Sequence, residues 1–328
     1  MKNKEPKNLK EEDESFPSKS NDNNNSYNDF NINTKQLMKK LKYYSDEVTC
    51  LCLLDDGRLV SGSKDNNIII YNKITYEQDL IIREHRDTVN CLIKLNSNTL
   101  ASCSSDKTIK VFKIKGNNYE ILQTLNEHKD RVNKIIKLIN KNLVSGSNDN
   151  SIIFYDKINN NKYQKNYLIS INGWCQSLTQ TKENEICYLE YDDDYYNIVF
   201  YDLKERKIKT SITDLNITGD EPFNMITKDL LIIGGYNEIY IINVNQYKLI
   251  KIIDVFNAGL IFGFCMLNNN MFLTGGEDKM IRQWKIEDQN ISLFSKKEEA
   301  DENIIFGLIK IGNGNIASIS DDNSIKIW

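Results

Sequence analysis

The stretch LVSGSKDNNIIIY at residues 59–71 decides the fold, because it returns at regular intervals along the 328-residue chain. It reappears as LASCSSDKTIKVF at residues 100–112 and as LVSGSNDNSIIFY at residues 143–155. With drift, the same frame ends at seven anchors spaced 41 to 46 residues apart: Tyr71, Phe112, Tyr155, Tyr201, Ile242, Trp284 and Trp328. A repeat of about 40–45 residues with several short apolar runs is typical of propeller blades, whereas helical repeats space their apolar residues about 3.6 apart.

Within the first repeat, short runs of β-forming residues alternate with turn signals such as Asp55-Asp56-Gly57. Four such runs lie at residues 48–53, 59–63, 68–71 and 80–82. Each period therefore predicts one four-stranded antiparallel sheet. Seven periods predict an all-β protein, a seven-bladed β-propeller.

The two ends of the repeat region predict how the ring closes. The last residue, Trp328, ends a third strand, so the seventh sheet lacks its outer strand. Residues 36–42 precede the first repeat in the place of an outer strand. We expect this N-terminal strand to pair with the C-terminal blade, since pairing removes an exposed sheet edge that would otherwise promote aggregation.

Two short motifs carry a resemblance to a known family. EHRDTV at residues 84–89 and EHKDRV at residues 127–132 stand where WD repeats have a Gly-His pair. In both copies the His precedes a Ser by 17 residues, and that Ser precedes a turn Asp by four. Residues 35–328 thus resemble the WD-repeat family, although the Trp-Asp dipeptide is degenerate, as in Tyr155-Asp156. The resemblance implies a seven-bladed propeller that binds other proteins.

A repeated constellation of His, Ser and Asp invites a catalytic reading, but a nucleophile needs substrate access and has no reason to occur twice at equivalent positions. The resemblance implies instead a buried hydrogen-bond chain from Asp through His to Ser. We expect these chains to stop early, because Phe112 and Tyr155 replace the Trp that often ends them. The two sets are His85, Ser102, Asp106 and His128, Ser145, Asp149.

These are the only two histidines in the chain, and no glycine-rich phosphate loop or metal-ligand set accompanies them. We therefore expect no catalytic residue, no cofactor and no metal site. The chain is predicted not to be an enzyme.

Composition sets the remaining expectations. The net charge is −4, from 42 basic and 46 acidic residues, which disfavours nucleic acid, and no apolar run approaches the roughly 18 residues of a membrane span. Seven cysteines without a CxxC pair are typical of free thiols in a reducing compartment, so we expect a cytoplasmic protein, with the nucleus as a second possibility. The polar residues 1–34 are predicted to be a disordered tail, and residues 35–328 the propeller.

The partner surface is expected on the face that carries the loops between outer and inner strands, together with the central channel, as the resemblance implies. Trp174 is an outlier near that rim and either anchors an interface or packs into blade four. Phe262 and Phe306 form an apolar sector there. Asn90 and Asn133 belong to an amide-rich arc that either meets a peptide backbone or packs between blades.

The leading hypothesis is a non-catalytic scaffold or adaptor that docks a peptide or protein partner, monomeric by itself within a larger complex. The alternative is a substrate-recognition subunit, for example of a ubiquitin ligase, that reads a phosphorylated motif. That chemistry requires arginines, because the guanidinium fork matches phosphate, and Arg86 and Arg131 are the two placed near the rim.

Overall fold

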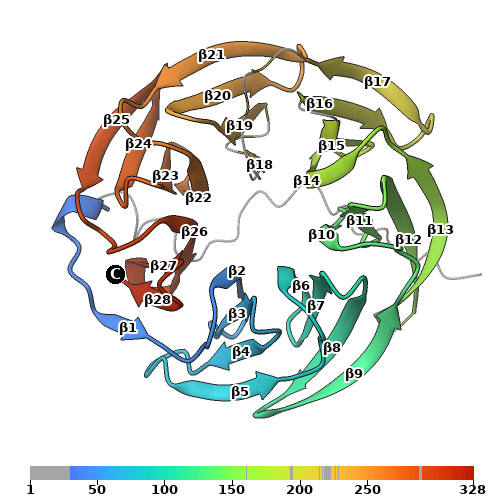
Figure 1. The fold of residues 1–328 in the computed structure, drawn as a ribbon, viewed down its shortest axis with the longest axis horizontal. Helices are drawn as coiled ribbons and strands as arrows, with labels where there is room; N and C mark the ends of the chain where they lie inside the picture. Colours follow the sequence, from blue (N-terminus) through green and yellow to red (C-terminus); the bar gives the residue numbers. More distant parts are fainter. Residues whose placement is uncertain are drawn as a thin grey trace, which may run out of the picture.

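In the computed structural model, seven four-stranded antiparallel sheets stand around a central axis as the blades of a ring (Figure 1). The structure describes residues 30–328 except 160, 193–194, 214, 216, 218–222, 226, 228 and 288–289. Residues 1–29 of the expected tail lie outside the described part. The predicted fold class, all-β with seven blades, is confirmed.

Each blade runs from an inner strand beside the axis to an outer strand at the perimeter, in chain order. Blade one comprises β2 Val48–Leu53, β3 Leu59–Ser63, β4 Ile68–Tyr71 and β5 Gln78–Ile82. Blade two comprises β6 Val89–Asn96, β7 Thr99–Ser104, β8 Ile109–Lys115 and β9 Asn118–Leu125. Blade three comprises β10 Val132–Lys137, β11 Leu143–Ser147, β12 Ser151–Asn159 and β13 Lys162–Ser170. Blade four comprises β14 Trp174–Lys182, β15 Glu185–Asp192, β16 Tyr195–Asp202 and β17 Lys207–Ile212. Blade five comprises β18 Phe223–Met225, β19 Leu230–Gly234, β20 Glu238–Asn243 and β21 Lys248–Asp254. Blade six comprises β22 Ile261–Asn268, β23 Met271–Gly276, β24 Ile281–Glu287 and β25 Asn290–Lys297. Blade seven comprises β26 Ile305–Ile311, β27 Asn315–Ser320, β28 Ser324–Ile327 and, from the other end of the chain, β1 Lys39–Leu41.

The core lies between the blades. Among the described residues, seven clusters of buried apolar side chains each join two neighbouring blades. Because both faces of a blade are covered, the middle strands are buried throughout, as in β3 and β4. This explains why the sequence of these strands is nearly continuously apolar or small rather than alternating.

Ring closure by the N-terminal strand is confirmed. β1 pairs antiparallel with β28, with Lys39 opposite Ile327 and Leu41 opposite Ile325. The Met38 N–H adds a bond of 2.8 Å to the Ile327 carbonyl oxygen. In Figure 1 the blue start of the described chain runs along the outside of the red last blade. The first and last blades are thereby held by backbone hydrogen bonds between the two ends of the chain.

Residues 30–34, which the sequence analysis placed in the tail, are part of the ordered ring. Phe30 and Ile32 are buried between blades six and seven, against Leu273 and Trp328 among others. The buried Gln283 amide fixes their backbone: its Oε1 accepts from the Ile32 N–H at 3.0 Å, and its Nε2 donates to the Phe30 carbonyl at 2.7 Å. These contacts place residues 30–34 with the propeller rather than with the tail that was predicted to end at residue 34.

We expect Ile32→Ala to lower the free energy of unfolding by roughly 2–5 kcal/mol, because it empties a fully buried site between two blades. Urea titration monitored by circular dichroism measures the change. Leu37→Ala is the matched control, since Leu37 lies five residues away and is 46% exposed, and it should change stability little. An Ile32→Ala protein as stable as wild type contradicts an anchoring role for this segment.

Candidate protein-interaction site

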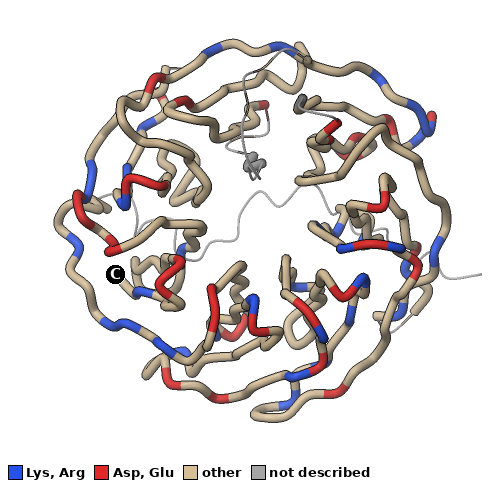
Figure 2. Tube along the Cα trace, viewed as in Figure 1, with Lys and Arg blue, Asp and Glu red and all other residues tan. Residues whose placement is uncertain are grey.

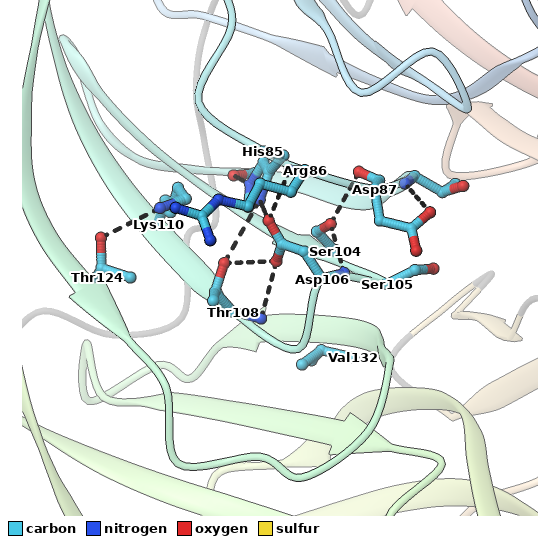
Figure 3. Close-up of polar contacts among 12 residues, drawn as sticks. His85, Arg86, Asp87, Ser104, Ser105, Asp106, Thr108, Lys110, Thr124 and Val132 are labelled. Atoms are coloured by element: carbon cyan, nitrogen blue, oxygen red, sulfur yellow. Dashed lines mark hydrogen bonds and ion pairs between the residues drawn. The ribbon is translucent and has the colours of Figure 1, made fainter.

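The imidazole of His85 is held at both ring nitrogens. Its Nδ1 lies 2.8 Å from Asp106 Oδ2 (Figure 3). Its Nε2 lies 2.6 Å from Ser102 Oγ. The same carboxylate also accepts the Arg86 backbone N–H at 3.0 Å. The His85 side chain is completely buried, so it has no access to a substrate.

His128 repeats this arrangement in blade three. Its Nδ1 lies 2.9 Å from Asp149 Oδ2, and its Nε2 lies 2.7 Å from Ser145 Oγ. The structure thus brings together both sets of three residues that the sequence singled out. In each blade the set ties the loop before the inner strand to the second strand and to the turn that follows it.

The hydrogen bond from a Trp indole N–H to the hydroxyl group of the second strand is present in two other blades. Trp284 Nε1 donates to Thr274 Oγ1 at 2.9 Å in blade six, and Trp328 Nε1 donates to Ser318 Oγ at 3.0 Å in blade seven. Both blades lack a histidine, so no blade of this chain combines His and Trp. In blade two Phe112 stands at the Trp position and has no polar atom with which to extend the chain.

The histidines affect the acidity of their partners. Burial raises the pKa of Asp106, but hydrogen bonds from His85 and Thr108 outweigh it and hold this pKa below the ordinary value for Asp. Asp149 behaves in the same way, with hydrogen bonds from His128 and Ser151. Both carboxylates are therefore ionised at neutral pH and stabilise the donors around them.

A pocket of about 360 Å³ lies where the inner strands begin, at the mouth of the central channel. Five of the seven predicted partner residues contribute to it: Asn90, Arg131, Asn133, Phe262 and Phe306. Trp174 and Arg86 are not among its lining residues. Glu47, Val48, Thr49, Lys64, Lys134, Gln176 and Ser177 complete the lining.

Phe262 and Phe306 form an aromatic pair on one side of the pocket. Their ring centroids are 5.4 Å apart and their planes are inclined at 59°. The strands that carry them approach closely, because Gly263 follows one ring and Gly307 the other. A Cβ on Gly263 would lie 3.2 Å from the Gly307 Cα, so a larger residue would push the strands apart. The predicted apolar sector is thus a defined pair of rings.

The amides of the predicted arc bridge neighbouring blades. Asn90 Nδ2 donates to the Val132 carbonyl of blade three at 2.8 Å, and Asn133 Nδ2 donates to the Cys175 carbonyl of blade four at 2.9 Å. The second amide hydrogen of each is used within its own blade. The sequence left two roles open for these amides, contact with a peptide backbone or packing between blades. The hydrogen bonds described here belong to packing between blades. Both residues nevertheless line the pocket.

Two cations lie opposite the aromatic pair without a carboxylate partner. Arg131 is exposed and donates from Nε to Asn133 Oδ1 at 3.0 Å. Lys134 lines both the pocket and the channel below it. Among the described residues no Asp or Glu pairs with either, whereas Lys64 at the same mouth pairs with Glu47 at 2.5 Å. Elsewhere acidic and basic residues are spread around the ring (Figure 2).

Trp174 and Arg86 lie apart from this pocket. Trp174 opens β14 and is 44% exposed, with its ring 5.7 Å from that of Tyr191. It is therefore neither in the core of blade four nor part of the channel mouth. Arg86 is exposed beside the His85 network (Figure 3).

Sequence reasoning missed two groups on this face. Lys134 lies inside an inner strand, where a charged residue gives no sign of facing a channel. Phe256, in the loop after β21, is 81% exposed, and Tyr236 is 57% exposed in the adjoining turn. For Phe256 and Tyr236 the available signal was a large aromatic residue next to the turn-forming residues Asn257 and Gly235.

The described residues contain no helix long and apolar enough to cross a membrane. In the same part of the chain, no three His, Cys, Asp or Glu side chains gather closely enough to hold a metal ion. All seven cysteines are free.

The ring and its channel-mouth pocket define a β-propeller of the kind that serves as an interaction domain. Residues 35–72, 77–113 and 119–156 each match the family described as WD domain, G-beta repeat. The chain thus carries three WD repeats within a ring of seven blades. No curated protein matches the chain.

We expect His85→Ala to destabilise the fold by roughly 1–3 kcal/mol, because the buried Ser102 and Asp106 lose their shared partner. Chemical denaturation measures the loss. Arg86→Ala, at the neighbouring exposed position, should leave stability nearly unchanged. Equal stability of the two variants contradicts a structural role for the network.

The lowered pKa of Asp106 predicts an acid-sensitive contribution to stability. Since its folded pKa lies below the unfolded value of roughly 3.9, the ionised form stabilises the fold above that pH, and this stabilisation is lost as the pH falls through the folded pKa. The destabilisation caused by Asp106→Asn should therefore shrink on acidification. Urea titrations at about pH 6 and about pH 3 test this. A stability difference between wild type and Asp106→Asn that is the same at both pH values contradicts this prediction. The control is Asp87→Asn, at an exposed position.

Proposed function

We propose that this chain is a non-catalytic scaffold or adaptor that docks a peptide or protein partner at the mouth of its central channel. WD-repeat propellers are generally interaction domains. The observation that carries the proposal is the pocket itself, in which the Phe262–Phe306 pair faces the cations Arg131 and Lys134.

The chemistry of the pocket favours a particular kind of segment. An apolar side chain of the partner would pack on the two phenylalanine rings, where aromatic contacts provide much of the binding energy in protein interfaces. An acidic group a few residues away would meet Arg131 and Lys134, which lack carboxylate partners within the described part of the chain. The volume of about 360 Å³ suits one or two such side chains rather than a folded surface.

Several features support a role without catalysis. Both histidines are buried in structural networks, so neither is available as a general base.

The free cysteines fit a reducing compartment, and we propose a cytoplasmic, or alternatively nuclear, protein that binds neither nucleic acid nor membrane. We further propose that the propeller is a monomer that enters larger complexes through its partner.

A second candidate function is the reading of a phosphorylated motif, as by the substrate-recognition subunit of a ubiquitin ligase. The unpaired Arg131 favours it, because a guanidinium binds phosphate through two parallel hydrogen bonds. Lys134 would add a second positive charge in the same pocket. Arg86, outside the lining, would not take part in this site.

The pocket is tested by affinity purification from lysate of the native organism, followed by mass spectrometry. We expect partners captured by wild type to be lost from the Phe262→Ala, Phe306→Ala double variant and reduced with Arg131→Ala, Lys134→Ala. The control is Ile74→Ala, which alters a side chain that is 77% exposed on the turn between β4 and β5, at the opposite end of the blade. Equal recovery by all variants contradicts this docking site.

Phosphatase treatment of the lysate separates the two candidate functions. Partners that bind through an apolar and acidic segment remain bound after treatment, whereas a phosphorylated motif loses the phosphate that Arg131 would hold. Trp174→Ala, tested in parallel, shows whether the exposed rim of blade four enlarges the interface.

A further inference from the structure

Two cysteines face each other across blade two. Cys91 in β6 and Cys103 in β7 are direct partners in the antiparallel register. Side chains at directly opposed positions project from the same face of a sheet, and both of these belong to the apolar cluster between blades two and three. The other five cysteines face residues that are not cysteines. This is the single cross-strand thiol pair of the chain.

The backbone spacing of such a pair suits a disulfide. Directly opposed residues in antiparallel strands have Cα atoms about 4.5–5.5 Å apart, within the range of about 4.4–6.8 Å found for disulfides. Their Cβ atoms, at about 4.5–5.5 Å, must approach by roughly 1 Å to reach the mean disulfide spacing of about 3.8 Å. A β-bulge between Val89 and Cys91 interrupts the register next to the pair, where the strand can adjust.

The two thiols differ in access. Cys91 lies on the inner strand and lines the channel beside Lys134, whereas Cys103 is completely buried behind it. Of the pair, Cys91 is therefore the one that a small polar molecule in the channel would meet first, although it is only 6% exposed. The second sulfur is placed to react only with the first.

The surroundings also make Cys91 the more reactive thiol. A hydrogen bond from the Cys103 thiol, together with the nearby Lys134 ammonium, lowers the pKa of Cys91 below its ordinary value in spite of burial. Burial raises the pKa of Cys103, and it raises that of Cys52 to about 11 and of Cys265 to about 12. Since the thiolate is the nucleophile, Cys91 is favoured among these four thiols.

We propose that Cys91 and Cys103 form a peroxide-sensitive pair that closes into a reversible disulfide within blade two. The Cys91 thiolate attacks one oxygen of hydrogen peroxide, an S–O bond forms as the O–O bond breaks, and the released hydroxide takes up a proton to become water. The Cys103 sulfur then attacks the sulfenic sulfur of Cys91. The S–O bond breaks, the S–S bond forms, and the leaving hydroxide combines with the Cys103 proton as a second water.

Closure of this disulfide alters the contact between blades two and three. Reduced Cys91 donates from Sγ to the Ile135 carbonyl of blade three at 3.7 Å, and this contact is lost when the sulfur bonds to β7. The preceding residue, Asn90, bridges to blade three from the same strand. Oxidation therefore weakens the contact between blades two and three. A disulfide that strains its strands is also more easily reduced, which makes the change reversible.

Peptide mapping of the full chain tests the proposal. The protein is treated with hydrogen peroxide, its remaining thiols are alkylated under denaturing conditions, and it is digested with trypsin without reduction. The tryptic peptides 87–94 and 95–107 each contain one cysteine of the pair, whereas Cys50 and Cys52 share peptide 43–58. We expect 87–94 and 95–107 to appear linked, with the loss of two hydrogens, and to separate after dithiothreitol.

Two variants assign the roles of the sulfurs. With Cys103→Ser, which keeps a hydroxyl donor beside Cys91, peroxide should leave a sulfenic acid at Cys91 that dimedone labels. Cys91→Ala should abolish the link and leave Cys103 in peptide 95–107 unlabelled. Cys265→Ala, which alters a buried thiol facing Leu273, is the control and should leave the link intact. Circular dichroism verifies that each variant is folded before oxidation. Folded wild type that gives no link, or that links peptide 43–58 to 87–94 instead, overturns the proposal.

Discussion

A sheet that is apolar on both faces remains in water only when a neighbouring sheet covers each face, and this chain meets that requirement through a closed ring. Every described core cluster lies between two blades, so no blade is complete without its neighbours. Opening the ring at any point would expose two apolar faces at once. The stability of the propeller therefore depends on the joint between its first and last blades.

The repeat in the sequence and the blade in space are out of step, and this offset makes the joint. The segment 35–72 that matches one WD repeat contains β1 and the first three strands of blade one. Each repeat thus begins with the outer strand of the preceding blade. For the first repeat the preceding blade is the last one, so β1 pairs with β28. Gln283 extends the joint by binding the backbone at Phe30 and Ile32, which fills the groove between blades six and seven.

The sequence predicts most of this architecture because repetition amplifies a weak pattern. The His85 and His128 sets could be assigned before the structure, since equal spacing in two copies rarely arises by chance. Phe30 and Ile32 could not, because two apolar residues in a polar segment carry no periodicity. The site was predictable only in part. Phe262 is found by its repeat position, whereas the inward direction of the Lys134 side chain depends on a bulge in β10 that no pattern announces.

The blades differ in the buried residue at the histidine position, although the apolar packing between neighbouring blades is the same throughout the described ring. In blade one Tyr44 replaces the histidine and bonds to Ser61 Oγ at 2.7 Å, and in blade seven Asp301 occupies that position and pairs with the buried Lys326 at 2.6 Å. Tyr44 and Asp301 thus each pair with a buried polar group of their own blade, since an unpaired buried charge is costly, although Asp301 Oδ2 is buried without a hydrogen-bond partner.

The charges at the channel mouth do not follow this pattern. Arg131 and Lys134 contribute no ion pair to the scaffold within the described residues, although Asp and Glu outnumber Lys and Arg in the chain. A scaffold under selection for stability alone gains nothing from two like charges that face a common pocket, because they repel each other. Their proximity to the aromatic pair is better explained by a ligand. Cys91 lines the channel below this pocket, together with Lys134 and Phe306, so the thiol pair that would respond to an oxidant lies close to groups that would bind the partner.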